Sequence, residues 1–360
     1  MLGMVANFVG WSIVMRGKNM AEKNGLHTKT NDIGKPERMP PVPALAGSDG
    51  LRLATCIFPH GEVPTVGIVL DDGSVVDIAL EAARQGREMG FAADSMLSLI
   101  AGGADGLKAI EALMVQAQRD KRDFANLNQV TLLAPIPEPQ RNIYCVGWNY
   151  LDHFEEGKSM RADQAVSKMP EHPVFFTKGT HTMNGPFGAI PHDAGNANST
   201  DWEAELAVVI GKRGRNIDER QAMEYVFGYA AYNDTSVREI QQKRHGGQWF
   251  KGKSLDGHGP MGPWLVTAEG VDLNQVRIAC RVNGVEKQNA AYNQMYFKIP
   301  RILAELSRGM TLEPGDIIAT GTPSGVGFGR TPPEFLQPGD VMETEITGIG
   351  VMRNIIEAEI

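Results

Sequence analysis

Two glutamates lie two residues apart at the start of a strongly apolar stretch, D-W-E-A-E-L-A-V-V-I-G. The residues after Ala204 favour a β-strand that enters a core, and alternation along that strand places Glu203 and Glu205 on one face. Two like charges beside a buried strand repel each other and need a positive partner. The stretch therefore predicts a charged site at the beginning of a core strand.

A third acid, Asp234, follows another apolar segment (residues 225–232) in Y-N-D-T-S-V-R-E. Three carboxylates could form an all-oxygen site, and oxygen ligands suit the hard cations Mg²⁺ and Mn²⁺ better than zinc. Spacing alone favours a simpler alternative, in which all three acids are solvated and Asp234 caps a helix that starts at Thr235.

Composition narrows the class of protein. The 360 residues carry a formal net charge of −8 and no long Lys/Arg cluster, which argues against nucleic acid as a partner. The three cysteines are far apart and form no C-x-x-C motif, so we expect a reducing, cytoplasmic location. The apolar run at residues 2–15 is too short to span a membrane, and no membrane partner is expected.

The chain divides into three predicted parts. Residues 1–49 read as a flexible N-terminal extension, because residues 21–49 are polar with a Pro-rich end. Residues 50–137 form a small β-rich domain with helical patterning over 92–118, which Gly102 and Gly103 interrupt. After a Pro-rich boundary, residues 138–360 alternate strand and turn signals, with helices expected at 219–227, 235–245 and 299–307. The predicted fold is α+β, mainly β: a mixed β roll or sandwich with helices packed outside.

Two further segments could carry chemistry. His153 and Glu156 are i and i+3 neighbours on a predicted helix. A carboxylate that holds one imidazole nitrogen leaves the other free to accept a proton, which makes a general-base dyad. Lys253 could stabilise an anionic intermediate near a metal. The simpler alternatives are a solvated helical turn and an exposed lysine.

Polar side chains with a possible binding role flank these segments. Arg238 and Gln241 lie near one helical face and could brace Asp234 or hold a substrate carboxylate, or form an exposed polar face. Thr322 lies in G-T-P-S-G, a tight loop that could bind an anion through its backbone N–H groups and the hydroxyl, or be a plain turn.

Taken together and in this order, the motifs resemble the fumarylacetoacetate hydrolase family. They cover residues 143–360, and each motif is weak alone. The matching pieces are C-V-G-W-N-Y-L-D-H-F-E-E, D-W-E-A-E-L-A-V-V-I-G, Y-N-D-T-S-V-R-E-I-Q, F-K-G-K-S-L-D-G, V-N-G-V-E-K-Q, L-E-P-G-D-I-I-A-T-G-T-P-S-G-V-G and a terminal P-G-D hairpin.

The resemblance implies a homodimeric mixed β-sandwich roll with one Mg²⁺ or Mn²⁺ per subunit and a small-molecule keto-acid substrate. On matching positions, it makes Glu203, Glu205 and Asp234 the metal ligands. It also makes His153 and Glu156 a catalytic dyad on a lid that closes over the substrate.

The same resemblance makes Lys253 a cationic stabiliser with Arg238 and Gln241 beside it, and it assigns the substrate carboxylate to Thr322. Where the family has the motif D-T-F, this chain has D-G-H, which ends in His258. The pocket wall is therefore expected to differ.

These roles predict hydrolysis of a C–C bond in a 2,4-diketo acid, of the acylpyruvate or fumarylpyruvate type, to pyruvate and a carboxylic acid. His153, oriented by Glu156, would deprotonate the attacking water, and Lys253 would stabilise the pyruvate enolate. Oxaloacetate decarboxylation and isomerisation or hydration of a 2-hydroxydienedioate are alternatives on the same site. A non-catalytic metal-binding dimer is the alternative of another class.

Overall fold

The computed structural model describes residues 35–36, 39–47, 50–157, 168–192 and 198–358. Most of the predicted extension and much of the predicted lid therefore lie outside the described residues. Residues 39–47 lie against the body, where the Ala46 N–H donates to the Gly270 carbonyl at 2.9 Å.

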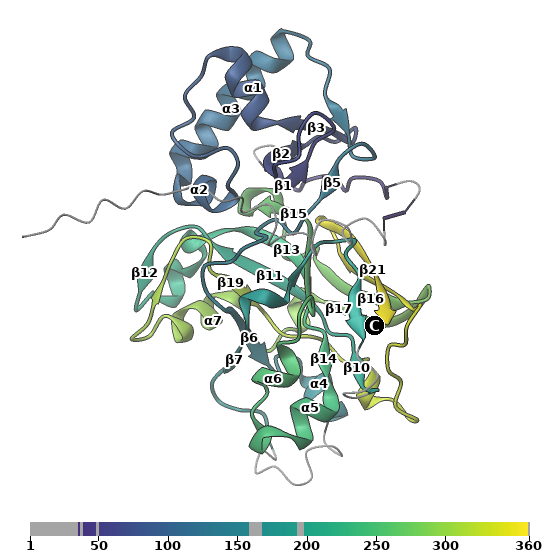
Figure 1. Ribbon diagram of the computed structural model, residues 1–360. Helices are drawn as coiled ribbons and strands as arrows, with labels where there is room; N and C mark the ends of the chain where they lie inside the picture. The colour runs from purple at the N-terminus through teal and green to yellow at the C-terminus, as the bar shows by residue number, and fades with distance from the viewer. Residues whose placement is uncertain (1–34, 37–38, 48–49, 158–167, 193–197, 359–360) are drawn as a thin grey trace, which may run out of the picture.

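A twelve-stranded sheet runs through the molecule (Figure 1). Its main path, in spatial order, is β4 (Ala125–Asn126), β3 (Ser74–Asp77), β2 (Thr65–Val69), β1 (Arg52–Ile57), β15 (Gly259–Thr267), β13 (Val226–Asn233), β11 (Ala204–Ile210), β19 (Ile317–Ala319), β6 (Ile143–Gly147) and β7 (Val174–Lys178). Off this path, β5 (Thr131–Leu132) pairs with β1 and β8 (Met183–Asn184) pairs with β15.

A second sheet of five strands packs against the first, with β20 and β21 in contact with β11 and β13. Its order is β17 (Val285–Ala291), β16 (Arg277–Val282), β20 (Val341–Ile346), β21 (Gly350–Ala358) and β9 (Ile190–His192). The predicted C-terminal hairpin is β20–β21. Two short pairs complete the strands: β10 (Thr200–Asp201) with β14 (Ser236–Val237), and β12 (Gly214–Arg215) with β18 (Thr311–Leu312).

The helices lie outside the sheets (Figure 1). They are α1 (Ile78–Gln85), α2 (Met96–Ala101), α3 (Gly103–Arg119), α4 (Leu151–Glu156), α5 (Arg238–Lys243), α6 (Phe250–Lys253) and α7 (Ile299–Leu306). Helices α1–α3 accompany the N-terminal strands at one end, whereas α4, α5 and α6 gather at the other. None of the helices among the described residues has the length and apolar character needed to cross a bilayer.

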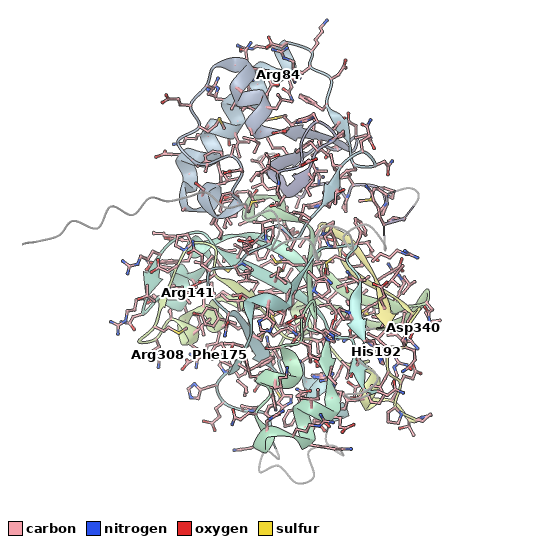
Figure 2. The ribbon with its side chains drawn as sticks, viewed as in Figure 1. Arg84, Arg141, Phe175, His192, Arg308 and Asp340 are labelled. Carbon is pink, nitrogen blue, oxygen red and sulfur yellow. The ribbon has the colours of Figure 1, made fainter. Side chains whose placement is uncertain are left out.

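Strand β11 lies at the centre because both of its faces are apolar. Leu206 and Val208 enter the core between the two sheets, and Ala207 and Val209 enter the core on the other side. Glu205 shares a face with Ala207, since side chains alternate along a strand. Charged groups such as Arg84, Arg141 and Arg308 lie at the periphery (Figure 2).

The α+β, mainly β prediction is confirmed. The β-rich N-terminal segment forms β1–β3, and β1 extends the large sheet by pairing with β15, Arg52 opposite Val266. The residues predicted as a helix at 219–227 form a 3₁₀ helix over Glu219–Tyr225, and the helix expected at 235–245 begins only at Arg238.

Candidate active site

Strand register brings the three candidate metal ligands together. Glu203 immediately precedes β11 and Asp234 immediately follows the antiparallel β13, so the Asp234 N–H donates to the Glu203 carbonyl at 2.9 Å. Carboxylate oxygens of Glu203, Glu205 and Asp234 all lie within 4.8 Å of one another, and all three side chains are buried. The solvated alternative is therefore wrong, and Val237, not Asp234, occupies the N-cap of α5.

Three buried cations pair with two of these acids, Glu203 and Asp234. The Lys253 Nζ lies 2.6 Å from Glu203 Oε2 and 2.7 Å from Asp234 Oδ2. Arg238 contacts Glu203 Oε1 at 2.6 Å, and Lys178 contacts Asp234 Oδ1 at 2.7 Å. The positive partner that like charges beside a core strand require is thus supplied by three elements.

The two glutamates differ in their electrostatic environment. Burial, followed by the Asp234 and Glu203 charges, raises the pKa of Glu205 well above its ordinary value. Burial also opposes ionisation of Glu203, but Lys253 and Arg238 hold its pKa below the usual range. A buried donor set made only of carboxylate oxygens fits Mg²⁺ or Mn²⁺, whose charge would relieve the repulsion around Glu205.

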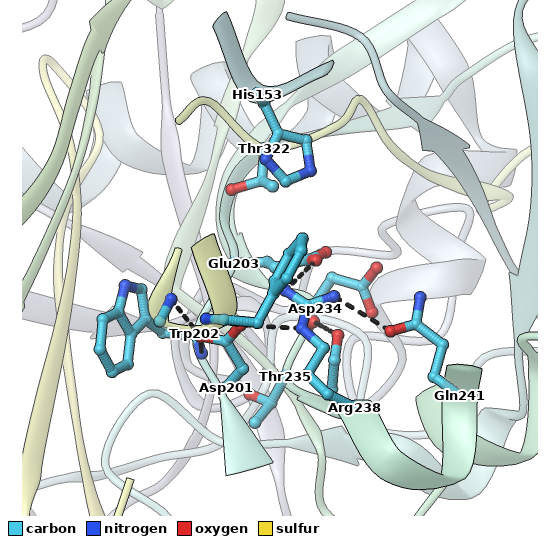
Figure 3. A network of polar contacts seen from close by, with 12 residues as sticks. His153, Asp201, Trp202, Glu203, Asp234, Thr235, Arg238, Gln241 and Thr322 are labelled. Atoms are coloured by element: carbon cyan, nitrogen blue, oxygen red, sulfur yellow. Dashed lines mark hydrogen bonds and ion pairs between the residues drawn. The ribbon is translucent and has the colours of Figure 1, made fainter. Parts of the chain in front are cut away.

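A pocket opens over the acids. Figure 3 shows His153 and Thr322 on one side of it, and Glu203 and Arg238 on the opposite side. It is lined by Val146, Gly147, Trp148, His153, Gly157, Phe176, Glu203, Glu205, Arg238, Gln241, Gln242, Trp249, Lys253, Thr322 and Phe328.

The predicted dyad is formed at the end of α4. His153 Nδ1 lies 3.3 Å from Glu156 Oε2, and His153 itself is buried at the pocket wall. Glu156 is held in turn by the Gly325 N–H, which lies 3.0 Å from Oε1 and 3.2 Å from Oε2. With Nδ1 directed at the carboxylate, Nε2 is the imidazole nitrogen that remains for a bound molecule.

The predicted substrate-binding residues line the same pocket. Arg238 donates to Gln241 Oε1 at 3.0 Å, which leaves the Gln241 amide N–H groups to face a ligand. Thr322 donates its hydroxyl proton to the Ala204 carbonyl at 2.9 Å and accepts from Gln288 at 2.7 Å. The Thr322 hydroxyl proton is thus already engaged within the protein, a contact that the sequence did not predict.

One wall of the pocket is aromatic. The Trp249 ring meets Trp148 edge-on at 5.1 Å and Phe176 at 5.2 Å between centroids. Gly147 makes this packing possible, because a Cβ there would lie 2.7 Å from the Trp249 ring. The pocket therefore offers charge on one side and apolar surface on the other.

Sequence reasoning missed Lys178, Asp201 and Trp249. Asp201 accepts from Arg238 Nε at 2.8 Å, and it is fully buried. The only local signal for Lys178 and Asp201 was a charged residue beside an apolar run. Their roles depend on strand pairing and loop contacts over long sequence separations, which local patterns do not encode.

A family model described as the fumarylacetoacetate hydrolase C-terminal domain matches residues 142–357. Oxaloacetate tautomerase YisK of Bacillus subtilis is 41% identical over 81% of this chain and 95% of its own length. The mitochondrial oxaloacetate tautomerase Fahd2a of Rattus norvegicus is 38% identical over 84% of this chain and 91% of its own length.

Solved structures of the same family are also similar to this chain. Fumarylacetoacetate hydrolase from Exiguobacterium antarcticum has a TM-score of 0.67 and 34% identity, over 86% of this chain and 100% of its own. Maleylpyruvate hydrolase from Sphingobium sp. SYK-6, in complex with manganese(II) and pyruvate, has a TM-score of 0.64 and 28% identity over the same shares. The family match covers the site and most of the fold, so the chain belongs to the fumarylacetoacetate hydrolase family.

Proposed function

We propose that this protein catalyses metal-assisted keto–enol tautomerisation of a short 2-oxo dicarboxylic acid such as oxaloacetate. The observation that carries the proposal is the His153–Glu156 pair: His153 lines the same pocket as Glu203, Glu205 and Lys253, and the third carboxylate, Asp234, lies beside these two glutamates. The names of two relatives that match over most of their length support the choice of reaction. Our sequence prediction named the site but not tautomerisation.

The chain's own residues account for binding. Arg238 and the Gln241 amide face the pocket and would hold a substrate carboxylate. Glu203, Glu205 and Asp234 would bind Mg²⁺ or Mn²⁺, which supplies a Lewis acid that polarises the 2-oxo group.

Proton transfer is assigned to His153. Its Nε2 would take a proton from C3 of the keto acid, and the electron pair of that C–H bond would form the C2=C3 bond. The oxygen of the 2-oxo group would then carry the negative charge, which the Lys253 ammonium would stabilise until the His153 imidazolium returns the proton to that oxygen. Glu156 keeps the imidazole in the orientation that exposes Nε2.

The test follows the enol absorbance of oxaloacetate in the ultraviolet with purified protein and Mg²⁺ or Mn²⁺. We expect fast equilibration that EDTA abolishes, and a loss of about 10²- to 10⁴-fold in His153→Asn. His172→Asn is the matched control, because its side chain is 63% exposed and pairs with Glu305. Wild-type activity in His153→Asn would contradict the proposed base.

Hydrolysis of a 2,4-diketo acid is a second candidate. It is favoured by the likeness to maleylpyruvate hydrolase and by the aromatic wall, which could contact an apolar acyl chain. Acylpyruvates assayed beside oxaloacetate separate the reactions. Pyruvate with a carboxylic acid identifies the hydrolase, and CO₂ from oxaloacetate the decarboxylase. Either of these at a rate above tautomerisation would displace our first choice.

Assembly and location belong to the same proposal. We propose a homodimer in the cytoplasm, as expected from the motifs and the cysteines. Light scattering on the eluted protein would give the mass of the assembly directly, and a monomer at working concentration would contradict the dimer.

A further inference from the structure

We propose that residues 325–329, the glycine loop, hold the dyad and the substrate arginine in one arrangement, with Gly329 and Asp201 as positioning residues. The geometry of this assignment is independent of the reaction, whereas its effect on turnover rests on the proposed function. The loop has the sequence G-V-G-F-G, and neither Gly327 nor Gly329 was singled out from the sequence.

Gly329 leaves the space that the Glu156 carboxylate occupies. A Cβ built on Gly329 would lie 2.5 Å from Glu156 Cδ and 2.7 Å from its Oε1, well inside van der Waals contact. The opposite end of the loop donates the Gly325 N–H to the same carboxylate at 3.0 Å. The loop thus both leaves room for the Glu156 carboxylate and donates a hydrogen bond to it, in the position where that carboxylate contacts His153.

Asp201 fixes the loop itself. Its Oδ1 accepts from the Gly327 N–H at 2.6 Å, and its Oδ2 accepts from the Phe328 N–H at 3.1 Å. The Glu334 N–H donates to the Gly327 carbonyl at 3.0 Å, and Trp202 Nε1 donates to the Gly325 carbonyl at 3.1 Å. Contacts from several parts of the chain therefore define one position for the loop.

The same Asp201 carboxylate reaches into the pocket wall. Its Oδ2 accepts from Arg238 Nε at 2.8 Å (Figure 3). The Arg238 guanidinium stacks 4.2 Å from the Phe328 ring centroid. The Phe328 ring also meets His153 edge-on at 6.2 Å. The position of the glycine loop therefore determines the orientation of both His153, the proposed base, and Arg238, the arginine that would face the substrate.

The decisive variant is Gly329→Ala, whose Cβ would fill the space that Glu156 occupies without contacting the three acids. The nearest atoms that must move all belong to the Glu156 side chain, from Cγ outward, so the clash falls on the residue whose position is tested. Misplacing a catalytic group by about 1 Å costs about 10²-fold in rate. We expect kcat for oxaloacetate to fall about 10- to 100-fold, with the KM and the Mn²⁺ affinity nearly unchanged.

A double-mutant cycle identifies the route of the effect. If Gly329 acts through Glu156, Gly329→Ala should cost less than about twofold in a Glu156→Gln background. Gly61→Ala is the matched control, because a Cβ on Gly61 meets no atom within 4 Å. Multiplicative losses, or full activity in Gly329→Ala, would overturn the proposal.

A readout that needs no turnover separates the two proposals. The ¹H–¹⁵N imidazole resonances of His153 in the Mg²⁺-loaded protein should move in Gly329→Ala and Glu156→Gln but not in Gly61→Ala. Moved resonances with an inactive wild type would refute only the proposed function. Unmoved resonances with an active wild type would refute the positioning role. If Gly329→Ala does not fold, Glu156→Ala/Gly329→Ala must fold, since it lacks the clashing atoms.

Discussion

At the scale of single residues, the site contains buried carboxylates that are paired with buried cations. Lys178 is the one of these cations that the sequence did not predict. The side chain is fully buried, with Nζ 2.7 Å from Asp234 Oδ1 and 3.0 Å from the Thr235 carbonyl. Burial lowers the pKa of Lys178, while Asp234 opposes the shift. A fixed cation here repels any dication held by the same aspartate.

Lys178→Met should therefore strengthen metal binding. We expect the Kd for Mn²⁺, measured by calorimetry, to fall about tenfold or more because one positive charge beside Asp234 is lost. The metal-free variant should melt at a lower temperature, since Asp234 loses a buried partner. Lys212→Met, at an exposed position, is the matched control. Weaker Mn²⁺ binding in Lys178→Met would refute the argument.

The residue patterns predicted the acids well and their partners only in part. Alternation was sufficient to place Glu203 and Glu205 together, because β11 is regular from Ala204 onward and the Glu203 carbonyl, one residue before it, still accepts from the Asp234 N–H. Lys178 ends β7, which, within the described part of the chain, joins the sheet through β6. No local pattern specifies that order, so the contact with Asp234 could not be derived from the sequence.

At the scale of elements, helix α3 has one buried side, and its core residues should contribute unequally to stability. Leu113 is fully buried there, whereas Val115 is 48% exposed. We expect Leu113→Ala to lower the free energy of unfolding by about 2–5 kcal/mol in urea titrations, because it leaves a cavity. Val115→Ala should change it by less than about 0.5 kcal/mol. Equal effects would contradict this packing.

Element boundaries show which signals compete. The break between α2 and α3 was predicted from Gly102 and Gly103, and it is observed. Within the stretch S-V-V-D-I-A-L, strand β3 stops at Asp77, whose side chain accepts the Leu80 N–H at 3.0 Å and starts α1. Similarly, Val237 pairs with Thr200 in β10–β14, which delays the start of α5. Capping and tertiary pairing override periodicity at these positions.

At the scale of the whole molecule, His258 makes the stability of the fold depend on pH. It is buried, with Nε2 2.8 Å from the Pro191 carbonyl. Burial first, and Lys178 second, lower its pKa from 6.5 to about 4. The unfolded chain therefore binds this proton at a higher pH than the native protein does.

Stability should fall as the pH decreases from about 6.5 to about 4, with a total loss of about 3 kcal/mol from this group. His258→Gln cannot take up the proton, so its unfolding free energy should decline less over that interval. Urea titrations at several pH values measure the difference between the two proteins. Parallel curves for the wild type and His258→Gln would rule out the contribution.

The aromatic wall has an optical consequence. Trp148 and Trp249 lie edge-on at 5.1 Å, and both line the pocket that a substrate would enter. Two indoles at that separation couple their electronic transitions, whereas Trp202 and Trp264 are buried and outside the pocket lining. The protein thus carries a native pair of coupled chromophores in the wall of the candidate active-site pocket. Ligand entry can therefore be followed by near-ultraviolet circular dichroism without any attached label.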